Sequence, residues 1–348
     1  MAKVITVAGL SEAAITYDPI LRTLPFLALE TAAAKLKLNI QEVENEDVLI
    51  NMRRKAGGTI PYAPGTAFAA QAEIAKFFET SLKPELVVYE VLDNITNYKE
   101  NKALVIAGTK LDLKSKVHPL EQLILMSIVK SHSEDVAFAM FHAERDNAVL
   151  TPMTSMTGFF PALDLLVTAG HIAAGQGNLE VTGAFTLDPL NLGTDTAPYD
   201  NLVEFIGTAN PLLKSTIGGN PQLLITLSAL KNVRDAYRNK VNAFQMPTMV
   251  QVLEALREDS FCPALEIATD EVLGSGSKVV LQKVGNMDLG FNTSKSEKFV
   301  QVRNIDRDPN VVQFWLEAAY GVRIRDVHKK IFKTNEQVNT RIDLSGDY

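Results

Sequence analysis

The sequence predicts an α+β fold, because helical and extended patterns occupy separate blocks of the chain and do not alternate as β-α-β units. The longest helical pattern runs from His118 to about Asp146, with apolar residues at a period near 3.6. Residues 48–113 and 278–327 are mostly extended in character. At 348 residues the chain is long for one compact core, so we expect two domains or one elaborate domain.

The composition excludes several classes of protein. Hydrophobic residues make up 46% of the chain and charged residues 22%, which excludes an intrinsically disordered protein. The best apolar window, 158–175, contains Asp164 and His171, so no membrane span is expected. The first 19 residues lack the sustained apolar core of a secretory signal. We therefore expect a soluble, acidic protein made in the cytoplasm.

Charge is unevenly distributed along the chain. The balance of 34 basic and 41 acidic residues gives −7, which argues against tight wrapping of nucleic acid by the whole molecule. Residues 297–341 hold nine basic and six acidic residues, a local +3, whereas the charged residues of 41–47 are all acidic. The two patches could meet between neighbouring copies and fix their register. The alternative, that both are solvated faces, stays open.

The first 45 residues form a separate region. A helix is expected from Leu27 to Leu38, because Asp18-Pro19 and Pro25 interrupt a helix before it. An acidic cluster follows at Glu42, Glu44, Glu46 and Asp47. Little in the surrounding sequence provides a core for this region, so we expect an arm that gains stability by lying on its neighbours.

The next block is expected to be extended. VLINMR, a turn at Gly57-Gly58 and then TIPYAP predict a hairpin, with a short alanine-rich helix at Ala67–Phe78 as a further element. The segments 86–94 and 103–113 are rich in β-branched residues and fit strands. Such paired strands could project as an arm or lie flat on a core, and both alternatives stay open.

The strongest helix signal begins at His118-Pro119, with proline at the first helical position. A continuous helix to about Asp146 would span roughly 42 Å. The sequence SHSE at 131–134 could instead be a kink or a second N-cap, which would leave two shorter helices.

The second half of the chain mixes helices and strands. Further helices are expected at 160–167, at 199–208, from Asn220-Pro221 to Gln245, and from the capping box of Thr248 and Gln251 to Asp259. Strands are expected at 278–284, 298–305 and 313–327. In the last of these, Val322 and Ile324 alternate with Arg323 and Arg325, which predicts one buried and one solvated face.

Two segments resemble nucleotide-binding motifs. Thr109-Lys110-Leu111-Asp112 matches the guanine-specificity pattern [NT]KxD, but no phosphate-binding GxxxxGK[ST] accompanies it, so a strand end with solvated charges is the favoured interpretation. Gly274-Ser275-Gly276-Ser277 lies between two strand-like runs and not before a helix, which favours a tight hairpin turn over a dinucleotide site.

The remaining search for chemistry predicts no catalytic residue, no cofactor site and no metal site. The five histidines are His118, His132, His142, His171 and His328. No HExxH occurs, and a helix would separate His132 from His142 by roughly 15 Å. The single cysteine, Cys262, excludes an intrachain disulfide and is expected to be a small buried residue. Asn94 and Asn292 match glycosylation acceptors that a chain without a secretory signal would not use.

Three segments give the chain a resemblance to a known family. TIPYAP, with a long excursion returning through ALVIAGTKLDLKS into the helix at 118–146, resembles an extended loop leading into a spine helix. PQLLITLSALKNVRDAYRNKV resembles a helix of an axial domain, and KFVQVRNIDRDPNVVQFWLEAAYGVRIRDVHKKIF resembles returning peripheral strands. The chain is thus similar, over most of 45–335, to the major capsid proteins of tailed bacteriophages, whose fold is shared with encapsulins and herpesvirus shells.

The resemblance implies the phage major capsid fold and its parts. It divides the chain into an N-terminal arm (1–47), a first peripheral-domain strand with an extended β-hairpin loop (48–102), a peripheral domain with a long spine helix (103–150), an axial domain (151–296) and returning peripheral-domain strands with a C-terminal strand (297–348). Only about 45 residues precede the extended region, too few for the scaffolding segment of some members. Scaffolding would then come from a separate protein, or the chain is a processed form.

The implied function is structural and not enzymatic. The chain would be the major capsid protein of a tailed phage or prophage, assembling in the host cytoplasm into pentamers and hexamers of an icosahedral virion shell around double-stranded DNA. Expected partners are other copies of the chain, a portal protein, a scaffolding protein and a decoration protein, with DNA held only by non-specific contact and no membrane involved. The alternatives are an encapsulin-like compartment shell and, more remotely, a nucleotide-binding enzyme using Thr109–Asp112.

Overall fold

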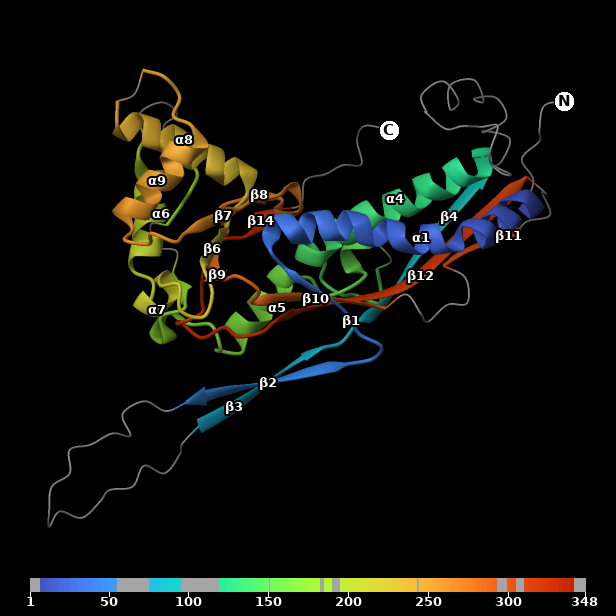
Figure 1. The fold of residues 1–348 in the computed structure, drawn as a ribbon, viewed down its shortest axis with the longest axis horizontal. Helices are drawn as coiled ribbons and strands as arrows, with labels where there is room; N and C mark the ends of the chain where they lie inside the picture. The colour runs from blue at the N-terminus through green and yellow to red at the C-terminus, as the bar shows by residue number, and fades with distance from the viewer. Residues whose placement is uncertain are drawn as a thin grey trace, which may run out of the picture.

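The computed structural model describes residues 7–54, 75–94, 119–149, 151–181, 185–189, 195–242, 244–292, 299–304 and 310–340. In it, an elongated body of two helices on a sheet continues into a smaller lobe, and a two-stranded hairpin leaves the body (Figure 1). Helices and strands are segregated as the α+β prediction requires.

The sheet of the body is organised around one long strand, β12 (Val311–Ile324). It pairs antiparallel with β4 (Glu85–Asn94), β10 (Met287–Asn292) and β11 (Val300–Asn304), while β1 (Asn39–Glu42) adds to β10 in parallel. On β12, β4 pairs with residues 311–320, β11 with 312–316 and β10 with 319–324. Because β4 shares positions of β12 with both other strands, β4 lies on one edge of β12, and β11 and β10 follow each other along the opposite edge. The strands predicted at 86–94, 298–305 and 313–327 are confirmed.

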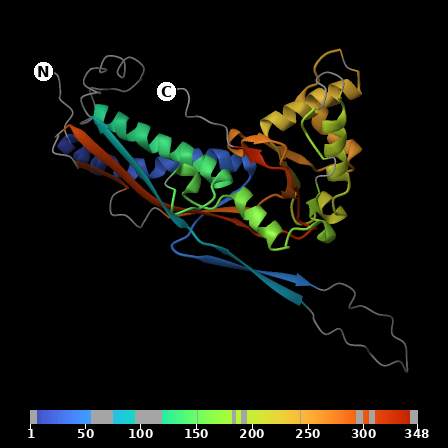
Figure 2. The ribbon, with the colours of Figure 1, turned by 180° about the vertical axis from the view of Figure 1, so that it is seen from behind.

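Two long helices cover this sheet, α1 (Val7–Leu36) and α4 (Pro119–His142), and they run side by side in both views (Figures 1 and 2). The predicted long helix is therefore confirmed as one continuous element. Residues 131–134 do not interrupt α4, because His132 and Ser133 are buried against the rest of the body. A shorter helix, α5 (Phe159–Thr168), packs on the C-terminal end of α4, as Phe159 and Phe160 stack on Phe141.

The expectation that the first 45 residues lack a core was wrong. α1 is a 30-residue helix that continues through Pro19 and Pro25, where the sequence predicted interruption. A proline inside a helix costs about 3 kcal/mol. Tertiary packing offsets that cost, since four leucines of α1 are fully or almost fully buried in the main core: Leu10, Leu21, Leu29 and Leu36.

The hairpin consists of β2 (Asp47–Arg54) and β3 (Ala75–Leu82), paired from Asp47 opposite Leu82 to Arg54 opposite Ala75. Figures 1 and 2 show β2 and β3 leaving the body, so the projecting alternative holds for this pair, whereas the predicted strand at 86–94 is β4 and lies flat in the sheet of the body. The predicted helix at Ala67–Phe78 was wrong from Ala75 onward, where the chain is already in β3. The predicted Gly57-Gly58 turn, TIPYAP and the strand at 103–113 lie outside the described residues.

The smaller lobe has a sheet and a core of its own. Its strands, in order across the sheet, are β5 (Leu179–Glu180), β13 (Phe332–Asn335), β9 (Val280–Lys283), β6 (Pro221–Leu224) and β7 (Glu266–Ala268). Its helices are α6 (Ala197–Gly207), α7 (Pro211–Lys214), α8 (Leu227–Lys240) and α9 (Met249–Asp259). Tyr199, Phe205, Leu223 and Val233 are fully or almost fully buried in a cluster separate from the core of the body.

One expectation in the lobe was wrong and two were confirmed. The helix predicted from Asn220-Pro221 does not begin there: Pro221 opens strand β6, because the apolar run after it is buried on both faces. Helix α8 begins later, where the side chain of Thr226 accepts a hydrogen bond from the amide of Ala229. The helix at 199–208 and the capping box of Thr248 with Gln251 are confirmed.

Short elements complete the fold. Gly274–Ser277 does not form a hairpin turn: β8 (Ser275–Gly276) pairs with the distant β14 (Asn339–Thr340). Three single-turn helices join the larger elements: η1 (Pro152–Thr154), η2 (Ala174–Gln176) and η3 (Glu271–Leu273).

Candidate functional surfaces

A buried cluster of charges holds the root of the projecting hairpin. Asp288 on β10 is fully buried and lies opposite Arg323 on β12, which is 4% exposed. The Asp288 carboxylate accepts hydrogen bonds from Arg323 Nη2 at 2.6 Å and Nε at 2.8 Å, and from Arg325 Nε at 2.7 Å. Arg323 Nη1 also contacts the carboxylate of Asp47, the first residue of β2, at 2.9 Å. The cluster therefore ties the hairpin to the sheet.

These contacts correct two expectations. The alternating pattern placed Arg323 on a solvated face, but the root of the hairpin covers that face and Asp288 neutralises the guanidinium. The acidic 41–47 segment and the basic C-terminal region were expected to meet between copies or to be solvated. Through Asp47 and Arg323 they meet within one chain.

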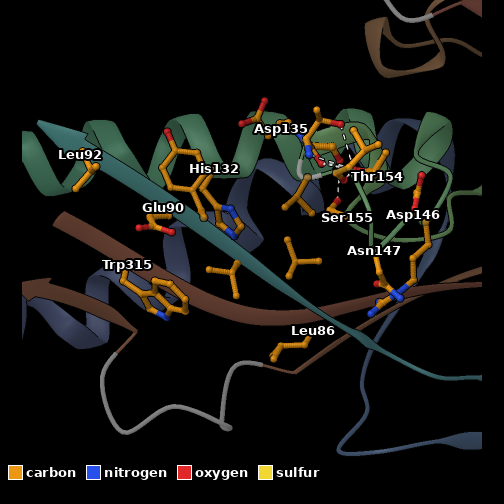
Figure 3. A pocket seen from close by; sticks show the side chains of 18 residues that line it. Leu86, Glu90, Leu92, His132, Asp135, Asp146, Asn147, Thr154, Ser155 and Trp315 are labelled. Atoms are coloured by element: carbon orange, nitrogen blue, oxygen red, sulfur yellow. Dashed lines mark hydrogen bonds between the residues drawn. The ribbon is translucent and has the colours of Figure 1, made fainter.

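A long open groove runs beside β4. Its volume is about 710 Å³, and it extends between β4, β12, the middle of α4 and residues of the segments 145–149 and 151–155. Leu86, Val88 and Leu92 alternate along β4 and are 41–61% exposed. Figure 3 shows Leu92 and Glu90 on β4, Trp315 on β12 and Asp135 on α4 around this space. Monomeric soluble proteins rarely leave such a strip of apolar strand uncovered.

The charged groups at the groove are mainly acidic. Glu90, Asp135 and Asp146 line it together with one base, Arg145, which gives a formal charge of 1 − 3 = −2. Arg145 is itself 3.4 Å from the carboxylate of Glu85. The groove therefore favours a partner that combines apolar side chains with positive charge.

His132 lies at the inner wall of this groove and is structural. Its ring lies between those of Tyr89 and Tyr320, in an edge contact with the first and tilted against the second, and its Nε2 is 3.2 Å from the Tyr320 hydroxyl. Burial lowers the pKa of His132 to about 4, so the ring is neutral at pH 7. Sequence reasoning considered His132 as part of a possible kink or N-cap and argued against a metal-ligand role, but it missed this packing role.

The other candidate residues are dispersed. His142 lies 3.1 Å from the Val272 carbonyl, His171 is exposed, and His328 lies near the lobe. Cys262 is buried, and burial raises the pKa of its thiol, as expected for an inert core residue. His118 and Thr109–Asp112 lie outside the described residues.

Searches over the described ranges find neither metal-ligand clusters nor membrane spans. No group of three or more histidine, cysteine or carboxylate side chains there could hold a metal ion. None of the helices in the same ranges is long and apolar enough to cross a membrane.

Comparison with known proteins places this architecture. A scan against models of protein families finds no match, and a search of curated proteins finds no relative. Among solved structures, the chain is similar to the satellite phage P4 procapsid that includes the size determination (Sid) protein, with a TM-score of 0.52, 14% identity and 92% of each chain covered. It is also similar to the capsid of Myoviridae phage XM1, with a TM-score of 0.52, 10% identity and coverage of 87% of this chain and 90% of that one.

A third likeness is to the capsid of the native GTA particle, with a TM-score of 0.50 and 12% identity over 89% of this chain and 97% of that one. At such identities, likeness of structure speaks for the fold alone. Since it spans nearly the whole of each chain, the protein described here has the capsid fold of the tailed phages.

Proposed function

We propose that this chain is the major capsid protein of a tailed bacteriophage or prophage, which assembles into pentamers and hexamers of an icosahedral shell around double-stranded DNA. The observation that carries the proposal is the capsid fold itself, which matches solved capsid structures over 87–92% of this chain. In this role the chain is structural and performs no catalysis. It acts in the virion after assembly in the host cytoplasm.

The projecting hairpin supports assembly with other copies. An isolated two-stranded hairpin is marginally stable in water, so β2 and β3 would gain stability by lying on a neighbour. By sequence, residues 53–76 carry four basic residues and one acidic residue, a charge of +3. The groove beside β4 is apolar and carries −2. We infer that the hairpin of one copy lies in the β4 groove of the next.

The parts of the subunit follow from this assignment. The body with α4 would be the peripheral domain, the lobe with α8 and α9 the axial domain, and β2–β3 part of the extended loop. A separate scaffolding protein, a portal protein and a decoration protein are the partners we propose. The net charge of −7 suits a container, because a negative wall holds DNA only weakly.

The test is assembly of the purified protein, alone and together with its scaffolding protein, followed by electron microscopy and light scattering. We expect closed shells with five-fold and six-fold rings. A chain whose residues 55–74 are replaced by a short glycine–serine turn is expected to fold and remain unassembled, since the described strands β2 and β3 are retained. A wild-type chain that stays monomeric with its scaffolding protein contradicts the proposal. Small cages that enclose a protein and no nuclease-protected DNA support the encapsulin-like alternative.

A further inference from the structure

The smaller lobe carries, on two neighbouring helices, charges of opposite sign that form no ion pair with any residue the structure describes. α8 and α9 are joined by the loop 241–248, which forms the upper corner of the lobe in Figure 1. Both helices bury one face in the core of the lobe: Val233 and Ala236 from α8, Val252 and Leu256 from α9. Their opposite faces are turned outward.

The outward face of α8 is a cationic stripe, which we define as Lys231, Arg234 and Arg238. Their spacings of three and four residues place them on one side of the helix. Lys231 is exposed, whereas Arg234 and Arg238 are half-buried. No carboxylate of the described residues forms an ion pair with any of them, and the buried Nε of Arg234 has no hydrogen-bond partner there. The last lysine of α8, Lys240, differs, because its ammonium lies 2.9 Å from Asp200 within the subunit.

The outward face of α9 is an anionic stripe, which we define as Glu254 and Glu258. Both side chains are exposed, and within the described ranges neither forms an ion pair. Arg257, the base next to them, turns toward its own subunit and donates a hydrogen bond to the Leu265 carbonyl at 2.9 Å. The lobe thus presents cations from one helix and anions from the next.

The two stripes have matching geometry. Arg234 and Arg238 are four residues apart, as are Glu254 and Glu258, so each pair of charges is separated by about 6 Å along its helix axis. Two such pairs can align as parallel ion pairs between two copies. Within one subunit the two stripes lie on different helices and both face outward. The cationic stripe on α8 of one copy would therefore contact the anionic stripe on α9 of another copy. A contact of this head-to-tail kind forms a ring when its rotation closes.

The corner between the stripes is apolar and uncovered. Phe244 in the α8–α9 loop is fully exposed, and Val241 and Met246 beside it are 46% and 44% exposed. A hollow of about 410 Å³ lies next to them, lined by Tyr237, Met246 and Pro247. An exposed cluster of this kind marks an interaction site. Because this apolar corner lies between the two stripes, the corners of all copies joined through the stripes would come together at the centre of the ring.

We propose that Arg234 and Arg238 of one copy pair with Glu254 and Glu258 of the next copy around each ring, with the Phe244 corners covered at the centre. This inference rests on the proposed function, since it assumes that copies form rings. A second copy fits these surfaces better than DNA. Phosphates would be attracted by the cationic stripe but repelled by Glu254, Glu258 and the exposed Glu204 of the same lobe.

The test reverses each stripe separately. The variant R234E/R238E presents acids on both sides of the lobe, and E254R/E258R presents bases on both sides. We expect each variant alone to lower the assembled fraction at least tenfold at low salt. The quadruple variant, which restores opposite charges at every contact, is expected to assemble within about threefold of wild type. The matched control K329E/K330E reverses two exposed lysines away from these helices and is expected to assemble normally.

A mixture of the two double variants gives the sharpest outcome. In a ring that alternates the two chains, every contact joins opposite charges, but alternation is possible only for an even number of copies. The equimolar mixture is therefore expected to recover six-membered rings and to remain deficient in five-membered ones. A misfolded variant could not be rescued in this way.

The possible results separate the two proposals. If wild type assembles and both double variants assemble equally well, or if neither the mixture nor the quadruple variant recovers, the stripe contact is overturned while the shell function stands. If R234E/R238E forms normal shells that have lost DNA, the stripe contacts nucleic acid and the inference is wrong. If wild type itself does not assemble with its scaffolding protein, the proposed function fails.

Discussion

Replacing Asp288 by asparagine is expected to destabilise the body of the subunit strongly. The substitution keeps the shape of the side chain but removes the fully buried charge that faces Arg323. Arg323 would keep only Asp47, whose side chain is 46% exposed and therefore screened by water. Breaking a buried ion pair by removing one partner costs about 3–5 kcal/mol. Folded domains have about 5–15 kcal/mol of stability in total, so D288N is expected to lose a large share of it.

Urea unfolding followed by tryptophan fluorescence measures this loss. The single tryptophan, Trp315, lies on β12 together with Arg323, so its signal follows the body of the subunit and not the lobe. The matched control is Glu134→Gln, which removes an exposed pair with Lys130 at 3.7 Å and is expected to cost less than about 1 kcal/mol. If D288N loses less than about 1 kcal/mol as well, Asp288 is not the charge that neutralises Arg323 and the argument fails.

Three further predictions concern other parts of the body. Deletion of residues 1–36 is expected to abolish cooperative unfolding, because the four buried leucines of α1 contribute about 1.5–3 kcal/mol each. The measurement is circular dichroism during unfolding. A deletion variant that stays folded and is defective only in assembly would instead support the sequence-based expectation that this region is an arm. His132 binds its proton below its ordinary pKa of 6.5, so the unfolded state takes up more protons and stability falls by roughly 3 kcal/mol as the pH drops from 6.5 to about 4. The variant H132Q should lose that part of the pH dependence in urea titrations, and an unchanged slope would show that other groups cause it. Gly158→Ala would place a Cβ 2.6 Å from the Ala139 carbonyl oxygen and is expected to cost about 1–3 kcal/mol in thermal unfolding, whereas Gly175→Ala, with open space around it, should be nearly neutral.

Local patterns were sufficient for much of the secondary structure. The 3.6-residue period predicted α4, the capping box predicted the start of α9, a β-branched run predicted β4, and the strand-like segment 313–327 with its alternating pattern predicted β12. These signals depend on residues close in sequence, which is why they can be recognised without the fold. The resemblance that led to the capsid fold also used the order of such elements and not any catalytic motif.

The candidate surfaces were much less predictable. Leu86, Val88 and Leu92 alternate as in any strand with one buried face, and only the fold shows that this strip is left open beside α4. The cationic and anionic stripes of the lobe could be recognised from the sequence only if the first residue of α8 were known. The predicted helix from Pro221 obscured this, although the threonine at 226 was a signal that could have corrected it.

The sequence by itself determined the α+β class, the long helix, the extended hairpin region and the absence of any recognisable catalytic motif. Only the tertiary structure decided the state of residues 7–36 and of the Asp47–Asp288–Arg323 cluster. In both cases the deciding energy comes from contacts between residues far apart in the chain. Burial of α1 against α4 offsets the local cost of two prolines, and an aspartate 35 residues away turns an apparently solvated arginine into a buried anchor for the hairpin.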